Sequence, residues 1–240
     1  YDICCRIREI LADTTKAKVH MLVKDRNLGH KPVNTSRFTH DEDEELLTTP
    51  AYRNLNPKQS ANLRWYLANS IFRKERKAGT DERKIIFASI HCDSLYNETL
   101  RGAMVYIPGA AYRRDSECPD PTSFYKQYAE AREELTFRST STQRKRDEAL
   151  SRNFAETLLL ELGKKKVKRH DKSDPIRNVI RQSGGVYYVP AVLRNNIIPT
   201  KILLEVANMT NHTDCERMAD PEWRQLVAEG FVNALIAHYE

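Results

Sequence analysis

The sequence has no apolar run long enough to cross a membrane, no internal repeat and no low-complexity segment. Because a membrane-spanning helix needs about 20 consecutive apolar residues, no transmembrane segment is predicted. No signal peptide stands at Tyr1, where the chain opens directly on a helical pattern. The 240 residues, of which 40% are hydrophobic and 30% charged, are typical of a globular protein with one large domain or two small ones.

Cysteine is scarce, and its spacing contains no metal-binding motif. The five cysteines are Cys4, Cys5, Cys92, Cys118 and Cys215. No two of them form a Cys-x-x-Cys pair, so the spacing excludes a zinc finger. Cys4 and Cys5 are adjacent and cannot easily bridge each other, and the odd number argues against a scaffold built from disulfides.

Positive charge exceeds negative charge, with a net charge of +6 and a pI of about 9.0. Such a balance suits an anionic partner such as nucleic acid, anionic lipid or an anionic polymer. Basic residues gather at 144–146 and 164–169, without the interleaved aromatic residues of a base-stacking surface. We interpret both clusters as solvated surface, and we expect no nucleic-acid partner because no nucleic-acid-binding motif is present.

Helical and strand patterns alternate along the chain. Apolar periodicity predicts helices over 2–12, 58–77 and 141–163, with Gly163 as the C-cap of the third, and a last helix from Pro221 with Leu226 in its buried stripe. Apolar runs predict strands over 18–23, 85–91, 102–107, 186–193 and 201–207. The order predicts an α/β fold in a single domain 1–240: three layers, with a mostly parallel twisted sheet and helices on both of its faces.

Two long segments do not fit this alternation. Residues 24–57 are rich in loop signals and include an acidic run, and residues 109–140 are interrupted by turn residues. Insertions are therefore expected at about 26–60 and 109–140. Insertions near a cleft often hold a substrate or a partner, although decorative surface loops remain an equal alternative. Residues 164–184 are predicted to form a basic, polar connection.

A histidine follows a strand-like run at Ile85–Ile90. The sequence Ser89-Ile90-His91-Cys92-Asp93 places an imidazole where this run ends. Open α/β sheets bind ligands at the carboxyl ends of their strands, so His91 is a candidate metal ligand or acid–base group. The alternative is a core histidine whose ring is hydrogen-bonded to a backbone carbonyl.

A glutamate lies inside a second apolar run, Pro199–Met209. A carboxylate in a buried strand is unfavourable unless it is paired, hydrogen-bonded or bound to a metal, so Glu205 is a candidate functional residue. A histidine that binds a metal and a glutamate that accepts a proton from water are the simplest set for metal-assisted hydrolysis.

These motifs occur in the order typical of one known family. The matching pieces are the opening helix Arg6–Leu11, Ala68-Asn69, the strand Ser89–Asp93, the following Arg101–Tyr106, the Pro-x-x-Leu-x-Glu-like run Pro199–Glu205, Thr210-Asn211, and Asp220–Glu229 with Tyr239. Taken together, and over nearly the whole chain, they resemble the zinc-dependent N-acetylmuramoyl-L-alanine amidases that cleave bacterial peptidoglycan.

The resemblance implies a site and a reaction. His91 would be a ligand of a Zn²⁺ ion, and Glu205 would be the catalytic carboxylate that activates water for hydrolysis of the amide between N-acetylmuramic acid and L-alanine. The substrate would be the muramoyl-peptide of peptidoglycan, in the periplasm or outside the cell, and an activating protein is a further candidate partner. The family's Gly-His-Gly-Gly loop and its glutamate ligand are not found, so the domain is expected to lack its N-terminal strand and its first two zinc ligands.

Side-chain alternation refines the neighbourhood of His91. Successive side chains of a strand point to opposite faces, so Cys92 is expected to face away from His91 and Asp93 to face the same way. Asp93 is therefore a candidate partner that hydrogen-bonds around the metal, or a ligand itself. The remaining histidines match no motif and are interpreted as surface or core residues: His20, His30, His40, His170, His212 and His238.

Two other functions stay open on the sequence alone. The first is a non-catalytic amidase-like domain that binds cell wall or a protein partner, which the missing zinc ligands favour and Glu205 disfavours. The second is a basic nucleic-acid-binding protein, which only the net charge supports; a steep salt dependence of DNA binding would favour it.

Overall fold

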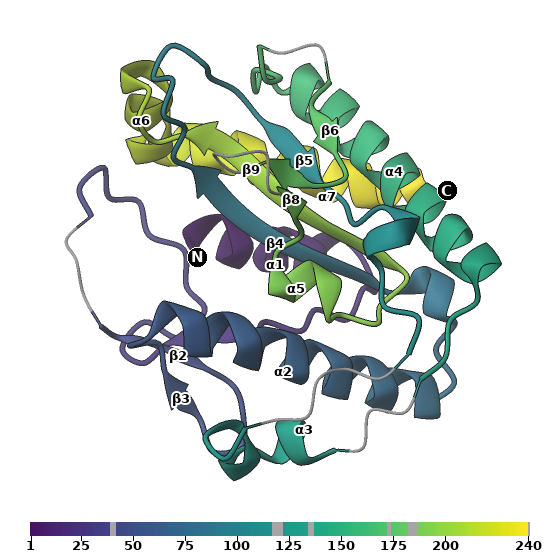
Figure 1. Cartoon of the computed structure of the whole chain (residues 1–240). Coiled ribbons are helices and arrows are strands. Elements are labelled where there is room, and N and C mark those ends of the chain that lie inside the picture. Colours follow the sequence, from purple (N-terminus) through teal and green to yellow (C-terminus); the bar gives the residue numbers. More distant parts are fainter. Residues whose placement is uncertain (39–41, 117–121, 134–136, 172–173, 182–186, 240) are drawn as a thin grey trace.

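The computed structural model describes residues 1–38, 42–116, 122–133, 137–171, 174–181 and 187–239. Within these residues the central sheet has four strands in the order β4 (Ile86–Asp93), β9 (Thr200–Asn208), β5 (Met104–Tyr106) and β6 (Ile176–Arg177) (Figure 1). β4 runs parallel to β9 and β5 parallel to β6, whereas β5 and β9 are antiparallel. The strands that carry His91 and Glu205 are therefore direct neighbours.

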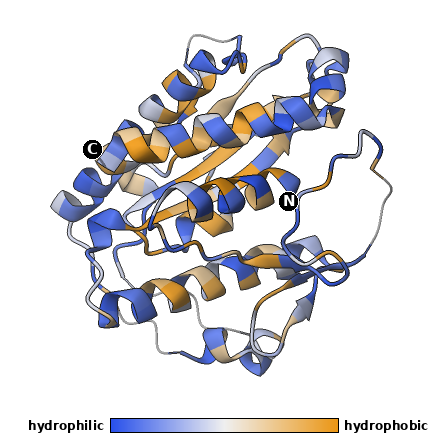
Figure 2. Ribbon diagram, turned by 180° about the vertical axis from the view of Figure 1, so that it is seen from behind, coloured by the Kyte–Doolittle hydropathy of each residue, from blue (hydrophilic) through white to orange (hydrophobic). Residues whose placement is uncertain are grey.

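Helices cover both faces of this sheet. One face packs against α2 (Pro57–Lys77) and the short α5 (Ala191–Arg194), through Phe72, Leu193 and Leu203 among others. The other face packs against α1 (Asp2–Thr14), α4 (Ser141–Lys164) and α7 (Pro221–Tyr239). Hydrophobic residues line the inward sides of the helices, as Figure 2 shows. The predicted three-layer α/β fold is confirmed.

The alternation of side chains along β9 assigns each residue to one of these two layers. Ile202, Leu204 and Val206 belong to the cluster under α1, α4 and α7, whereas Leu203 belongs to the cluster under α2. This is the period-two pattern of a strand that is buried on both faces. Glu205 therefore shares the α2 side of the sheet with Leu203.

Local sequence signals explain where the long helices begin and end. Asn56 caps α2, because its side chain accepts hydrogen bonds from the backbone N–H groups of Lys58 and Gln59, at 3.1 Å each. Thr140 and Gln143 form a capping box at the start of α4. The predicted C-cap at Gly163 is wrong: α4 continues to Lys164, and the chain turns at Lys166, whose φ is 61°.

The remaining elements lie around this core. They are a small sheet of β1 (Val23–Asp25), β2 (Glu44–Leu46) and β3 (Tyr52–Arg53), the hairpin β7 (Ile180–Arg181) and β8 (Tyr187–Tyr188), the helices α3 (Ala129–Arg132) and α6 (His212–Ala219), and three 3₁₀ turns at Glu82–Lys84, Ala110–Tyr112 and Tyr125–Gln127. Tyr52 of β3 packs edge-on against Phe124 and Tyr128. The segments expected to be insertions therefore contact each other beside α2.

Three predictions about the secondary structure are wrong, for tertiary reasons. Residues 18–21 have strand propensity but make no backbone–backbone hydrogen bond among the described residues, and Leu22 only accepts one from Leu47, so β1 begins at Val23. The predicted strand 186–193 is split between β8 and α5 and does not join the central sheet, and its first residue lies outside the described part. Within the predicted connection 164–184, Ile176 and Arg177 form β6 by pairing with β5.

The last helix also differs from the prediction at one residue. Leu226 was expected in the buried stripe of α7, but 37% of it is exposed, whereas Trp223, Val227 and Phe231 are buried.

No helix in the described ranges is both long and apolar enough to cross a membrane.

Gly102, before β5, is where a small substitution should destabilise the fold. Its φ is +97°, and an added Cβ would lie 2.6 Å from the backbone oxygen of Arg169. We expect Gly102→Ala to lower the free energy of unfolding by roughly 1–3 kcal/mol, because alanine is strained at this φ and its Cβ would clash with the backbone of Arg169. Gly163→Ala is the matched control: it meets no atom within 4 Å and lies in a helix, so a gain of about 0.5–1 kcal/mol is expected. Urea denaturation of both variants measures the difference; equal stabilities would contradict it.

Candidate active site

His91 and Glu205 are register partners on adjacent parallel strands. β4 places His91 directly opposite Glu205 of β9, and Met104 of β5 is opposite Glu205 on its other side. Neighbouring strands are about 4.8 Å apart, so the two side chains project close together from one face of the sheet. The fold thus brings together the two residues that the sequence singled out separately.

Glu205 is a buried carboxyl group with an unsatisfied oxygen. It is 8% exposed, and its Oε2 atom has no hydrogen-bond partner within the described residues. Burial, and then the nearby charge of Asp93, raise the pKa of Glu205 to about 8. Because this value is close to neutrality, the group can both accept and release a proton under ordinary conditions. Among the residues that the structure describes, no hydrogen bond to Oε2 offsets its burial.

A β-bulge places Asp93 next to this carboxyl group. The strand register shifts after His91, so that Asp93 pairs with Asn208 of β9. Asp93 Oδ1 accepts a hydrogen bond from the backbone N–H of Ser94 at 2.8 Å, whereas its buried Oδ2 has no partner in the described part of the chain. Asp93 and Glu205 therefore each present one free carboxylate oxygen. Cys92, by contrast, packs against the opposite cluster, as expected.

His91 stands at the surface of the site. Its side chain is exposed, and its Nε2 lies 2.9 Å from Ser89 Oγ. The protein around the ring disfavours the imidazolium form, and the positive charge of Arg64 adds to this, so the pKa of His91 falls to about 4. Solvent thus reaches part of the ring, although the surrounding protein atoms exclude enough water to disfavour its charged form. At neutral pH the ring is neutral, which is the form that binds metal ions.

Arg64 of α2 is a site residue that the sequence reasoning did not identify. Ala68 and Phe72 pack on the face of the sheet that holds Phe87 and Met104, and Arg64 lies one helical turn before Ala68 on the same stripe. Its charge acts on His91, and burial lowers its own pKa. The only available signal was this spacing of four residues, which is common in any amphipathic helix.

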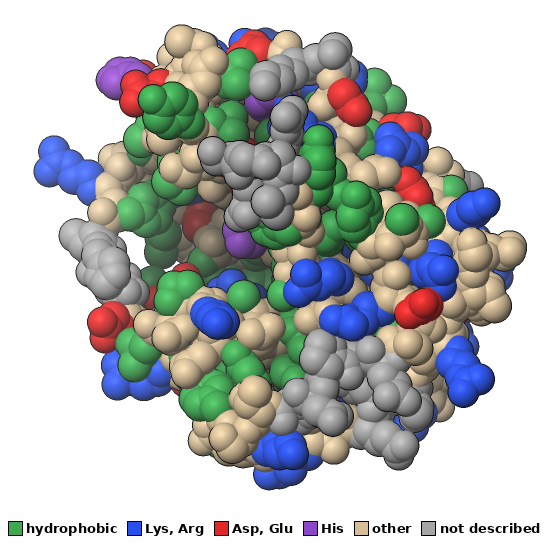
Figure 3. Space-filling model, viewed as in Figure 1, with side chains coloured by type: hydrophobic (Ala, Val, Ile, Leu, Met, Phe, Trp, Pro, Cys, Tyr) green, Lys and Arg blue, Asp and Glu red, His purple; other side chains and the backbone are tan. Residues whose placement is uncertain are grey.

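Figure 3 shows a hollow in the face seen in Figure 1, with acidic and histidine side chains beside hydrophobic ones. The described residues do not complete a zinc site there, because no three His, Cys, Asp or Glu side chains gather closely enough to hold a metal ion. A catalytic zinc ion normally takes three protein ligands and keeps one position open. His91 is one suitable ligand, and the carboxylate oxygens of Asp93 and Glu205 that lack partners in the described chain are further candidates.

The other histidines have partners or packing of their own. His20 Nε2 lies 3.0 Å from Glu75 Oε1, His30 Nε2 lies 3.2 Å from the Val23 oxygen, and His212 lies 3.5 Å from Glu216. His170 is buried, and His238 packs against Phe154. His40 lies outside the described residues.

A sequence model of a protein family and two solved structures that resemble this chain all describe amidases. The sequence model described as N-acetylmuramoyl-L-alanine amidase matches residues 6–237. The N-acetylmuramyl-L-alanine amidase Ami1 of Mycobacterium smegmatis is similar in structure, with 18% identity over 99% of this chain and 73% of that protein, and a TM-score of 0.50. The CwlD amidase of Clostridioides difficile, solved in complex with the GerS lipoprotein, has 13% identity over 99% of this chain and 83% of that protein, and a TM-score of 0.51. No curated protein sequence matches the chain.

Proposed function

Because the chain belongs to the N-acetylmuramoyl-L-alanine amidase family, we propose that it hydrolyses the amide bond between N-acetylmuramic acid and L-alanine of peptidoglycan in a zinc-dependent reaction. One observation carries the proposal: the buried carboxyl group of Glu205, whose Oε2 has no hydrogen-bond partner among the described residues, lies in register with His91. A carboxyl group placed in this way, with a pKa near neutrality, is suited to proton transfer.

Glu205 is the proposed general base. Its ionised carboxylate takes a proton from a water molecule, whose oxygen adds to the carbonyl carbon of the scissile amide. The carboxyl group then delivers that proton to the amide nitrogen as the carbon–nitrogen bond breaks. The products are the lactyl carboxylate of the sugar and the free amino group of L-alanine.

His91 is the proposed zinc ligand that this chain supplies from the sheet. When bound, zinc would polarise the carbonyl group and lower the pKa of water. The described residues do not gather two further ligands beside His91, so the complete site needs groups outside these residues. Asp93 would hold its position beside Glu205 and keep the pKa of that carboxyl group high.

The substrate and location follow from the family. A muramoyl-peptide is the proposed substrate, so the enzyme would work in the periplasm or outside the cell. The amidase from Clostridioides difficile was solved with a lipoprotein, and a protein partner that activates this chain is part of the proposal. A second candidate function, a non-catalytic domain that binds cell wall, is favoured by the incomplete ligand set of the described residues.

Analysis of the products separates the two candidates. Purified peptidoglycan is incubated with the protein and zinc, and the soluble products are examined by mass spectrometry and amino-terminal labelling. The proposal predicts that new amino-terminal L-alanine and peptide-free N-acetylmuramic acid residues form in equal amounts. Binding to peptidoglycan without any new amino terminus would support the non-catalytic domain, and new reducing sugar ends would indicate a different bond.

The pH dependence of the reaction should respond to Asp93. Its negative charge contributes to the raised pKa of Glu205, so Asp93→Asn is expected to lower that pKa. Because the ionised form of Glu205 acts as the base, the acidic limb of the pH–rate profile should move to lower pH, by up to about one unit. Asp115→Asn, on a distant exposed loop, is the control. An unchanged acidic limb would show that Asp93 does not act on Glu205.

A further inference from the structure

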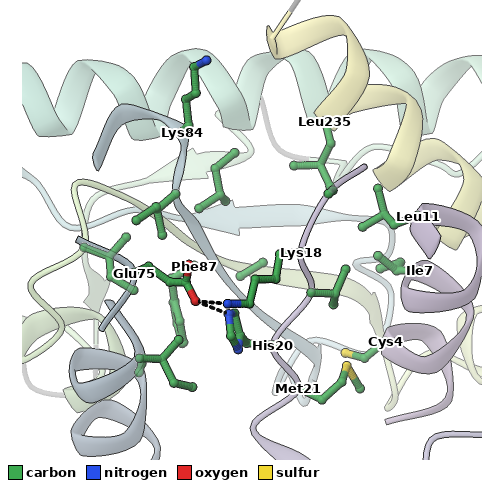
Figure 4. A pocket seen from close by; sticks show the side chains of 18 of the residues that line it. Cys4, Ile7, Leu11, Lys18, His20, Met21, Glu75, Lys84, Phe87 and Leu235 are labelled. Atoms are coloured by element: carbon green, nitrogen blue, oxygen red, sulfur yellow. Dashed lines mark hydrogen bonds and ion pairs between the residues drawn. The ribbon is translucent and has the colours of Figure 1, made fainter. Parts of the chain in front are cut away.

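Two half-buried charged side chains near the end of α2 have partners within the fold. Arg73 pairs with Glu133. Glu75 lines the apolar cavity of about 670 Å³ that Figure 4 shows, and it accepts hydrogen bonds from Lys18 at 2.5 Å and from His20 at 3.0 Å. Taking a charge out of water is unfavourable unless a counter-charge or hydrogen bonds offset it, and both residues have such a counter-charge.

Arg64, earlier on the same helix, is half-buried, yet its guanidinium makes no hydrogen bond and no ion pair with any residue that the structure describes. Burial lowers the pKa of Arg64, and the charge of Glu44 counteracts this only in part. Arg113 shows what a buried guanidinium requires. It donates hydrogen bonds of 2.7 to 3.0 Å to the backbone oxygens of Pro108, Asp147 and Pro199 and to Ser151 Oγ. A guanidinium has five N–H donors and stays protonated in proteins, so Arg64 is suited to bind an anion that the described chain does not supply.

Arg64 is close to His91, at the face of the sheet that also holds Glu205. Ala68 follows Arg64 by one helical turn and packs in one cluster with Met104, the register partner of Glu205. After burial, the positive charge of Arg64 is the largest influence that lowers the pKa of His91. The cation of α2 and the carboxyl group of β9 are therefore on either side of His91, where a substrate would be bound.

The proposed reaction creates negative charge on one group of the substrate. The carbonyl oxygen of the lactyl group is neutral in the amide, becomes an oxyanion when water adds to the carbon, and belongs to a carboxylate in the product. A fixed cation beside this oxygen stabilises the oxyanion more than the amide and so lowers the barrier. A planar guanidinium also matches the two oxygens of a carboxylate with two parallel hydrogen bonds.

We propose that Arg64 is a catalytic residue that binds the lactyl oxygen of the muramoyl group, first as the oxyanion of the tetrahedral intermediate and then within the carboxylate of the product. The inference rests on the proposed function and adds the group of the substrate that Arg64 recognises. The source of the carboxylate is the sugar acid, not the peptide.

The protons and electrons of this reaction balance without any transfer to or from Arg64. When water adds to the carbon, its proton goes to Glu205 and the electron pair of the carbonyl double bond moves onto the oxygen that Arg64 binds. When that pair returns, the carbon–nitrogen bond breaks, its electrons leave with the nitrogen, and Glu205 gives the proton to the nitrogen. The carboxylic acid that remains loses its own proton to solvent, so Arg64 then faces a carboxylate.

Binding of two sugars tests this role without requiring turnover. N-acetylmuramic acid carries the lactyl carboxylate, whereas N-acetylglucosamine is the same sugar without the lactyl group. Calorimetry in the presence of zinc should show that the parent protein binds N-acetylmuramic acid at least about tenfold more tightly. Arg64→Gln should lose this preference, and Arg64→Lys, which keeps the charge but not the planar fork, should keep part of it. Arg76→Gln is the matched control on the same helix, since 45% of the Arg76 side chain is exposed, and it should keep the full preference.

Kinetics of the same variants measure the effect on the reaction. Arg64→Gln should lower kcat by roughly 10²–10³-fold with little change in KM, which is the usual effect of removing an oxyanion donor. Added ethylguanidinium should restore part of the activity of Arg64→Ala but none of the activity of Glu205→Gln, a result that a purely structural role of Arg64 would not produce.

The inference and the proposed function fail in different ways. A preference for N-acetylmuramic acid that is unchanged in both Arg64→Gln and Arg64→Lys would overturn the inference, even in a protein that hydrolyses peptidoglycan. If Arg64→Gln weakened binding of an L-alanyl dipeptide but not of N-acetylmuramic acid, Arg64 would bind a peptide carboxylate, and the inference would again be overturned. Loss of the preference in a protein that hydrolyses no amide would support binding of the sugar acid by Arg64 and contradict the proposed function alone.

Discussion

Glu205→Gln is expected to reduce amide hydrolysis by roughly 10²–10⁴-fold, which is the usual contribution of a positioned general base. Glutamine keeps the shape of the side chain but cannot accept the proton from water. Neither β9 nor the packing of Leu203 and Leu204 should change, since only one atom of the side chain is replaced. Turnover of a soluble muramoyl-peptide by the zinc-loaded protein measures the loss.

At neutral pH, Glu205→Gln should raise the stability of the folded protein although it lowers the activity. The folded-state pKa of Glu205, about 8, is above its ordinary value of 4.5, so the folded state binds the proton more tightly than the unfolded state. Wild-type stability should therefore fall as the pH rises from about 4.5 to about 8, and Glu205→Gln should remove this part of the fall. Glu156→Gln, at an exposed residue of α4, is the control. Full activity of Glu205→Gln would exclude Glu205 as the base.

Phe154→Ala is expected to lower the free energy of unfolding by about 3–5 kcal/mol, the typical loss for removal of a buried phenylalanine. Phe154 has no exposed surface and lies where α4 meets α7. Its ring packs edge-on against Phe231, with centroids 5.8 Å apart, and against His238 at 5.3 Å. Because the structure around a truncated core residue relaxes only partly, a cavity remains and adds to the cost of the lost apolar burial.

Leu160→Ala is the matched control for this prediction. Leu160 belongs to the same helix but is 61% exposed, so its truncation should change stability by no more than about 0.5 kcal/mol. Denaturation in guanidinium chloride, followed by circular dichroism, compares the two variants with the parent. If Phe154→Ala lost no more stability than Leu160→Ala, the α4–α7 contact could not be the centre of the core.

Local patterns in the sequence predicted the layers of the fold well. The long helices α2 and α7, and the strands β4 and β9, have regular apolar spacing and clear end signals, and they were placed within a few residues. The same patterns could not predict pairing. Residues 18–21 look like a strand, but a strand forms only where a neighbour supplies hydrogen bonds, and none in the described chain does so there. By contrast, β6 exists because β5 lies beside it.

The residues of the candidate site likewise include some that the sequence predicted and some that it did not. His91 and Glu205 stood out because each is a polar residue in an apolar run, and the structure places them in register. The bulge that brings Asp93 beside Glu205 has no sequence signal, because it results from the change of register against β9. Arg64 was not identified, since only the packing of α2 on the sheet brings its charge close enough to His91 to lower the pKa of that ring.

The metal dependence of hydrolysis tests the central claim most directly. Amide hydrolysis is measured after removal of metal by a chelator and again after addition of zinc, in the parent protein and in His91→Ala. The account predicts that chelation abolishes the activity, that zinc restores it in the parent, and that zinc does not restore it in His91→Ala. Hydrolysis that survives chelation, or that returns fully in His91→Ala, would contradict a zinc amidase site built on His91 and Glu205.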